Sequence, residues 1–164
     1  MTSRHMVYVL IGLILCGIPL IVLATVSSKS AALPTQPLPI QCFDHTTITD
    51  PTRLYTYTAC CAYDSNEITG WYRFTGNGGT RLVTTQLSQT NICGGSYPGW
   101  WNGTLPKAIG ATHVGTMCFY TGGHFDGSYC ANPLSPIIAT NCGDYYVFYL
   151  LPVSCCSYRY CTTP

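Results

Sequence analysis

The sequence predicts a small, all-β, disulfide-rich domain of short antiparallel strands and hairpins, which follows an N-terminal hydrophobic helix. Between residues 42 and 161 no window keeps a helical period, whereas β-branched and aromatic runs are interrupted about every ten residues by Gly, Pro or Asn. The chain holds eleven cysteines, a number typical of an oxidising compartment. Its length of 164 residues fits one folded domain behind a short leader.

The first segment, residues 1–28, is predicted to be a signal peptide or a signal anchor. Its uncharged run at residues 7–26 exceeds the about 7–15 apolar residues of a secretory signal and approaches the about 20 that span a bilayer. The small residues Ser28, Ser30 and Ala32 offer cleavage positions, which favours a secreted protein. Arg4 would instead hold an uncleaved helix as a type II anchor with the domain outside. Both fates stay open, and the membrane is expected to be contacted only through this segment.

Residues 29–41 are predicted to be a proline-rich linker. Three prolines alternate there with small or apolar residues, which favours an extended spacer over a packed element. The folded domain is therefore expected to span residues 42–164.

Five runs of the domain are predicted to be strands. WYRF at 71–74 and TRLVTTQL at 80–87 are separated by a Gly-rich segment that can adopt positive φ, which predicts a β-hairpin. Further strands are expected at 113–121, 136–142 and 145–151. The last of these is apolar enough to be buried on both faces.

Ten of the cysteines lie within the predicted domain, an even number that allows five disulfides of roughly 2–4 kcal/mol each. Zinc is disfavoured because paired C-x-x-C motifs are absent and the four histidines are far apart. Adjacent cysteines are expected to bond to two separate neighbours, since a bridge within such a pair is strained. The ten are Cys42, Cys60, Cys61, Cys93, Cys118, Cys130, Cys142, Cys155, Cys156 and Cys161.

Four motifs in a fixed order carry a family resemblance. They are GWYRFTGNGG at 70–79, ICGGSYPGWWNGTLP at 92–106, CGDYYVFYL at 142–150 and CSYRYC at 156–161. The run resembles the cysteine-rich domain, with eight or ten cysteines, of uromodulin and of the pancreatic zymogen-granule membrane glycoprotein. The resemblance covers the whole predicted domain. It implies a non-enzymatic extracellular glycoprotein module.

The sequence also departs from that family. Two family cysteines are missing, near Gln86 and at Tyr129, whereas Cys155 and one member of the Cys60–Cys61 pair are additional. The comparison with the family therefore implies a rewired bridge between this pair and Cys155. Relatives join the domain to growth-factor-like repeats and a polymerising zona-pellucida module, so the expectation is a uromodulin-like protein without that module.

One sequon, Asn102-Gly103-Thr104, is present, and its nearest proline, Pro106, lies outside the tripeptide. Asn102 is therefore predicted to be N-glycosylated. In the family the matching sequon lies in a module whose glycans are captured by mannose-binding bacterial pili. The resemblance implies that Asn102 presents a decoy glycan to microbial lectins.

Three further residues are candidate ligand contacts. Trp100 and Trp101 directly precede the sequon, and exposed aromatic pairs can stack on sugars, although such residues more often pack in a core. Strand alternation predicts that one indole is buried and the other lies near the surface. Arg73 is expected first to be a structural residue that caps carbonyl groups or pairs with Asp64 or Glu67, and only second to contact a ligand.

Composition and motifs narrow the function. Six acidic and seven basic residues nearly cancel, which disfavours nucleic-acid binding. No enzyme is expected, because no nucleophile-elbow motif exists and because His124 and Asp126 lie in a Gly-rich loop where solvated polar residues are typical. No metal and no cofactor are expected either. Two function classes remain: a recognition or adhesion module that contacts glycans or glycan-binding proteins, and a structural subunit of a coat, matrix or filament. The second class is suggested by the low fraction of charged residues, 8%, because a surface with little charge does little to oppose self-association.

Overall fold

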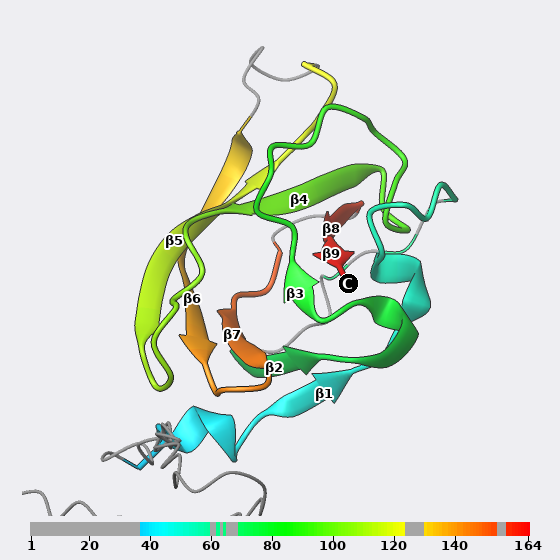
Figure 1. Ribbon diagram of the computed structural model, residues 1–164. Helices are drawn as coiled ribbons and strands as arrows, with labels where there is room; N and C mark the ends of the chain where they lie inside the picture. Colours follow the sequence, from blue (N-terminus) through cyan, green and yellow to red (C-terminus); the bar gives the residue numbers. More distant parts are fainter. Residues whose placement is uncertain (1–36, 60–61, 63, 65–68, 124–129, 154–156) are drawn as a thin grey trace, which may run out of the picture. The chain divides into compact units, whose positions relative to one another are not determined.

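The computed structural model describes residues 37–59, 62, 64, 69–123, 130–153 and 157–164 (Figure 1). These residues fall within one compact unit, Pro34–Pro164. They contain nine strands and three short 3₁₀ turns, so the all-β prediction is confirmed. The described residues include no helix able to cross a membrane. The predicted N-terminal helix and most of the predicted linker lie outside them, as do Glu67, His124, Asp126 and the cysteines at 60, 61, 155 and 156.

Seven strands form one curved sheet in the order β1-β2-β7-β6-β5-β4-β8 (Figure 1). The central strands are antiparallel, as predicted, whereas β1 and β8 at the two edges run parallel to their neighbours. A second, two-stranded sheet pairs β3 with β9. The bounds are β1 Thr46–Ile48, β2 Gly70–Phe74, β3 Arg81–Leu82, β4 Tyr97–Asn102, β5 Thr112–Phe119, β6 Ala131–Asn141, β7 Tyr146–Leu150, β8 Tyr158–Tyr160 and β9 Thr162–Thr163.

The strands expected at 113–121, 136–142 and 145–151 correspond to β5, β6 and β7. Their β-branched and aromatic residues fit a pleated, packed surface. Strand β7 is the most buried of the three, with Phe148 in the main core and Val147 on the opposite face beside the Cys42–Cys142 bridge. The prediction that this strand is buried on both faces is confirmed at Phe148 and Val147, whereas Tyr149, on the same face as Val147, is only partly buried.

The predicted hairpin between 71–74 and 80–87 is wrong. Strand β2 already has two neighbours, β1 and β7, so no free edge remains for β3. Instead β3 pairs with β9 near the C-terminus, with Arg81 opposite Thr163 and Leu82 opposite Thr162. The Gly-rich segment turns the chain away from β2, and Gly79 at φ 84° sits where an added Cβ would lie 2.7 Å from the Thr163 carbonyl oxygen.

Two faces of the large sheet are packed differently. The inner face holds the main core, which includes Phe74, Trp101, Phe119, Phe148 and Tyr160. The other face of β4 and β5 is covered by the segment that follows β3, and a second cluster forms there around cystines. These packed layers fix the position of the C-terminal end of β4.

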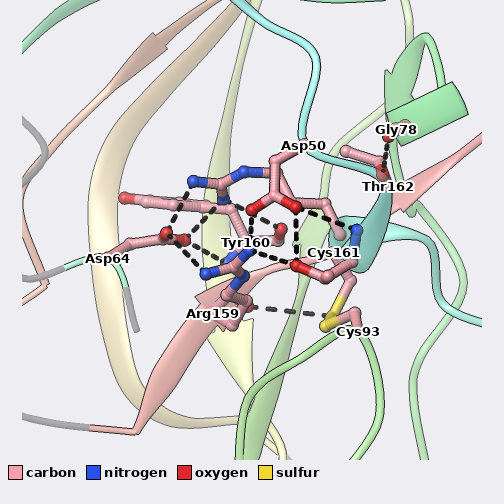
Figure 2. Close-up of a disulfide and its surroundings, with 10 residues drawn as sticks. Asp50, Asp64, Gly78, Cys93, Arg159, Tyr160, Cys161 and Thr162 are labelled. Atoms are coloured by element: carbon pink, nitrogen blue, oxygen red, sulfur yellow. Dashed lines mark hydrogen bonds and ion pairs between the residues drawn. A yellow bond between two sulfur atoms is a disulfide. The ribbon is translucent and has the colours of Figure 1, made fainter. Parts of the chain in front are cut away.

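Six cysteines of the described residues form three disulfides. The pairs are Cys42–Cys142, Cys93–Cys161 and Cys118–Cys130, with sequence separations of 100, 68 and 12. Cys93–Cys161 ties the segment before β4 to the chain between β8 and β9 (Figure 2). The rewired bridge expected for the Cys60–Cys61 pair and Cys155 involves residues outside the described part and stays a prediction, which peptide mapping of the non-reduced protein would test.

Candidate functional site

The sequon lies at the end of strand β4. Asn102 is the last residue of the strand and its side chain is exposed, in contrast to the four buried residues that precede it. Thr104 is exposed as well, and its carbonyl oxygen accepts a hydrogen bond from Nδ1 of His113 at 2.7 Å. Both residues that an oligosaccharide transferase must recognise are therefore on the surface, at a point where the backbone is held.

The sequon packs on the indole of Trp101, whose side chain is fully buried and which we call the base of the site. Its Nε1 donates to the carbonyl oxygen of Ile137 at 3.3 Å, and its ring meets Phe148 edge-on at 6.2 Å between centroids. Gly103 lies directly on this indole, because an added Cβ would be 2.5 Å from Cε2 and Cζ2 of Trp101. The middle residue of the sequon is thus seated on the core while its two neighbours point outward.

The chain after the sequon is fixed by side chains from β6 and β7. Nδ2 of Asn141 donates to the carbonyl oxygens of Pro106 at 3.0 Å and of Lys107 at 3.1 Å. The hydroxyl of Tyr146 donates to the same Pro106 oxygen at 3.2 Å. The sequon therefore sits between a strand and an anchored loop.

The prediction that one of the two neighbouring indoles lies near the surface is wrong. Trp100 and Trp101 do point to opposite faces of β4, but their side chains are only 5% and 0% exposed. Trp100 packs in the second cluster beside Cys118 and Cys93, because the segment after β3 covers that face of the strand. Neither indole is available as the ligand contact that the sequence suggested.

Arg73 also differs from expectation. Its guanidinium lies 3.8 Å from the ring centroid of Tyr145, a cation–π contact, and not on Asp64. Asp64 is occupied by another arginine, and Glu67 lies outside the described residues. The half-buried guanidinium of Arg73 therefore has a structural contact on the outer face of the sheet.

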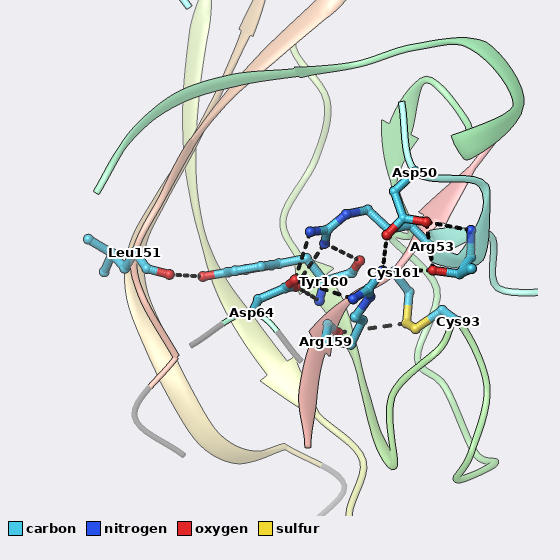
Figure 3. A network of polar contacts seen from close by, with 9 residues as sticks. Asp50, Arg53, Asp64, Cys93, Leu151, Arg159, Tyr160 and Cys161 are labelled. Carbon is cyan, nitrogen blue, oxygen red and sulfur yellow. Dashed lines mark hydrogen bonds and ion pairs between the residues drawn. A yellow bond between two sulfur atoms is a disulfide. The ribbon is translucent and has the colours of Figure 1, made fainter. Parts of the chain in front are cut away.

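A buried ionic cluster was not predicted from the sequence (Figure 3). Asp64 accepts two hydrogen bonds from Arg53, Nη1 to Oδ2 at 2.8 Å and Nη2 to Oδ1 at 2.7 Å, and a third from the amide of Tyr160 at 2.7 Å. Nη1 of Arg159 lies 3.8 Å from Oδ1 of the same carboxylate. Arg53, Asp64 and Arg159 are 3%, 1% and 3% exposed, so substrate cannot reach them.

Asp50 completes this cluster by pairing with Arg159 and capping the 3₁₀ turn at Pro51–Arg53 (Figure 2). Its Oδ1 accepts from the amide of Thr52 at 2.9 Å and from the Thr52 hydroxyl at 2.7 Å. Burial raises the pKa of Asp50, but the hydrogen bonds from Thr52 and the positive charge of Arg159 outweigh burial and hold the pKa below its usual value. Two arginines and two aspartates thus balance in charge. The one hint in the sequence was Arg159 between two tyrosines of a cysteine-bounded strand.

A family model for a uromodulin-like domain matches residues 72–162, which is more than half of the chain. The chain belongs to this uromodulin-like family. The match includes the sequon and all strands from β4 to β8, so the resemblance carried by the four motifs is confirmed.

Curated relatives place the uromodulin-like domain within longer proteins. The human pancreatic secretory granule membrane major glycoprotein GP2 is 31% identical over 123 residues, which is 75% of this chain and 22% of that protein. Rat uromodulin is 32% identical over 124 residues, 75% of this chain and 18% of that protein. Rat GP2 is 29% identical over 160 residues, 91% of this chain and 26% of that protein. The chain therefore spans only a minor part of the length of these relatives.

Proposed function

We propose that this uromodulin-like domain is an extracellular recognition module that presents an N-glycan at Asn102 to glycan-binding proteins, microbial mannose-binding lectins among them, and has no catalytic role. The observation that carries the proposal is the exposure of Asn102 and Thr104 on a base formed by the buried Trp101. A glycan attached there starts from a fixed point. Such preorganisation reduces the ordering cost when a lectin binds.

Three features support the location and the absence of catalysis. Disulfides of the kind seen here persist in secreted and cell-surface proteins. The relative GP2 is a glycoprotein by name. Among the described residues, the polar cluster around Asp64 is buried and its members form ion pairs, which favours a structural role over a catalytic one.

The test uses the full chain secreted from eukaryotic cells. Intact mass before and after enzymatic removal of N-glycans measures occupancy, and a mannose-specific lectin measures presentation. Wild-type protein is expected to bind the lectin, and Thr104→Ala is expected to lose both the glycan mass and the binding. Thr104→Ser keeps the sequon and serves as the matched control. Lectin binding that survives in Thr104→Ala would contradict the assignment to Asn102.

A second candidate function is self-assembly through the edge strand β1. Thr46 and Thr47 are exposed there, and the strand carries no charge that would oppose pairing with another chain. Size-exclusion chromatography and negative-stain microscopy of the secreted protein test this function. A single monomeric species at high concentration would rule it out.

A further inference from the structure

The outer face of the large sheet carries an apolar row that crosses four strands. Trp71 of β2 is opposite Tyr149 of β7, Tyr149 is opposite Ile138 of β6, and Ile138 is opposite Val114 of β5. We call these four side chains the outer row. Val114 is 64% exposed, and the other three are partly exposed. Trp71, at the end of the row far from Val114, also packs against the cluster of Cys42, Cys142 and Val147.

The outer row differs from the usual solvent-facing surface of a β-sheet in its composition. When one face of an antiparallel sheet covers the core, the other normally carries polar residues. Here the side chains are aromatic and aliphatic, and the rings of Trp71 and Tyr149 touch edge-on at 5.5 Å between centroids. An apolar surface of this kind marks contact with another layer.

The glycan attachment point borders this row. Asn102 is opposite Thr116, which lies two residues from Val114 on β5. Gly115 and Met117 face the core, where they meet Trp101 and the main cluster, so Val114 and Thr116 face outward. A diagonal pair on one sheet face is separated by about 7–8 Å between Cα atoms. Asn102 therefore stands diagonally beside Val114 on the outer face.

We propose that the first sugars of the Asn102 glycan pack on the outer row, beginning over Val114 and Ile138. This inference rests on the proposed glycosylation of Asn102. Pyranose rings expose C–H faces together with uncharged hydroxyl edges, a chemistry that suits an apolar row without charges. Covalent attachment supplies a high effective concentration, so a weak contact is sufficient to order the inner sugars. The outer sugars are then directed away from the sheet, toward a lectin.

A thermodynamic cycle tests the contact. The four proteins are wild type, Thr104→Ala, Val114→Thr/Ile138→Thr, and the combination of all three changes, each secreted as the full chain. The glycan is expected to raise Tm by about 3 °C in the wild-type background, a shift of the size that a modest contact gives in a domain of this length. In the Val114→Thr/Ile138→Thr background this increase is expected to disappear. Val114→Thr alone, at a site that is 64% exposed, covers the case in which the double change impairs folding.

Ile109→Thr is the matched control. Ile109 is also exposed, at 56%, but lies in the loop before β5 and outside the outer row. The glycan is expected to stabilise this variant as it does the wild type. An unchanged glycan-dependent Tm increase in the Val114→Thr/Ile138→Thr background would overturn the proposal.

Two other results distinguish a failure of the glycan contact from a failure of the proposed glycosylation of Asn102. Mass spectrometry that finds Asn102 unmodified would refute the proposed function itself, whatever the cycle shows. Sedimentation that finds the fully glycosylated protein as a dimer, dissociated by Val114→Thr, would assign the outer row to a second copy and overturn the glycan contact.

Discussion

Replacing Asp64 by alanine is expected to lower the free energy of unfolding by about 3–5 kcal/mol, the loss typical when one partner of a buried ion pair is removed. The side chain of Asp64 is 0% exposed, and its carboxylate binds both terminal nitrogens of Arg53 at 2.7–2.8 Å and the amide of Tyr160 at 2.7 Å. Without it, the guanidinium of Arg53 is left in a site where the side chain is 4% exposed. The free energy of unfolding of a typical domain is about 5–15 kcal/mol, so this loss would remove a large part of the total stability.

Urea unfolding at pH 7 with the disulfides intact measures this effect through the midpoint and the slope. Asp144→Ala, on an exposed turn, is the matched control and is expected to change stability by no more than about 0.5 kcal/mol. Removing the guanidinium of Arg53 as well, in Arg53→Met/Asp64→Ala, is expected to recover about 1 kcal/mol or more relative to the sum of the single variants. A loss below about 1 kcal/mol in Asp64→Ala, or strict additivity in the double variant, would refute the assignment of a buried, coupled pair.

Three further changes test other parts of the structure. The pKa of Asp50 is lowered in the folded state, so Asp50 stabilises the fold at pH values above its unfolded pKa, and this stabilisation is lost as the pH falls through the folded pKa. The variant Asp50→Asn should therefore flatten the acid part of a profile of Tm against pH. An unchanged profile would contradict the role of this carboxylate. Replacing both cysteines of the Cys42–Cys142 bridge by serine opens a loop with a sequence separation of 100 and should lower the free energy of unfolding by about 4–5 kcal/mol, as measured by urea unfolding. A loss under about 2 kcal/mol would show that this bridge does not constrain the unfolded chain. Gly103→Ala keeps the sequon but forces a Cβ against Trp101, so glycan occupancy should persist while stability falls by about 1–3 kcal/mol, and unaltered stability would show that the indole is not the base of the site.

Some features of the candidate site were accessible without a structure. The sequon is a local property of three residues, and its acceptor chemistry does not depend on the rest of the chain. The alternation of side chains along a strand correctly placed Trp100 and Trp101 on opposite faces. Their burial was not predictable in this way, because exposure depends on which distant segment covers each face. The segment after β3 covers Trp100, and β3 itself pairs with β9, which is about 80 residues away in the sequence.

The buried ionic cluster was missed for a related reason. Asp64 and Arg159 are 95 residues apart in the sequence, and charged residues near Gly and Tyr are ordinarily taken as solvated. Only the folded chain brings Arg53 and Arg159 around one carboxylate beside the Cys93–Cys161 bridge (Figures 2 and 3). Arg73, which the sequence offered as the partner of Asp64, has Tyr145 instead.

By itself the sequence determined the all-β class, the disulfide chemistry, the uromodulin-like family and the sequon at Asn102. These follow from composition, short-range periodicity and the order of motifs, which are properties of local stretches of chain. The tertiary structure alone decided which strands are neighbours, which indoles are covered and where an apolar row borders the sequon. Those outcomes depend on contacts between residues far apart in the chain, whose free energies compete over the whole domain, and no local pattern records the result.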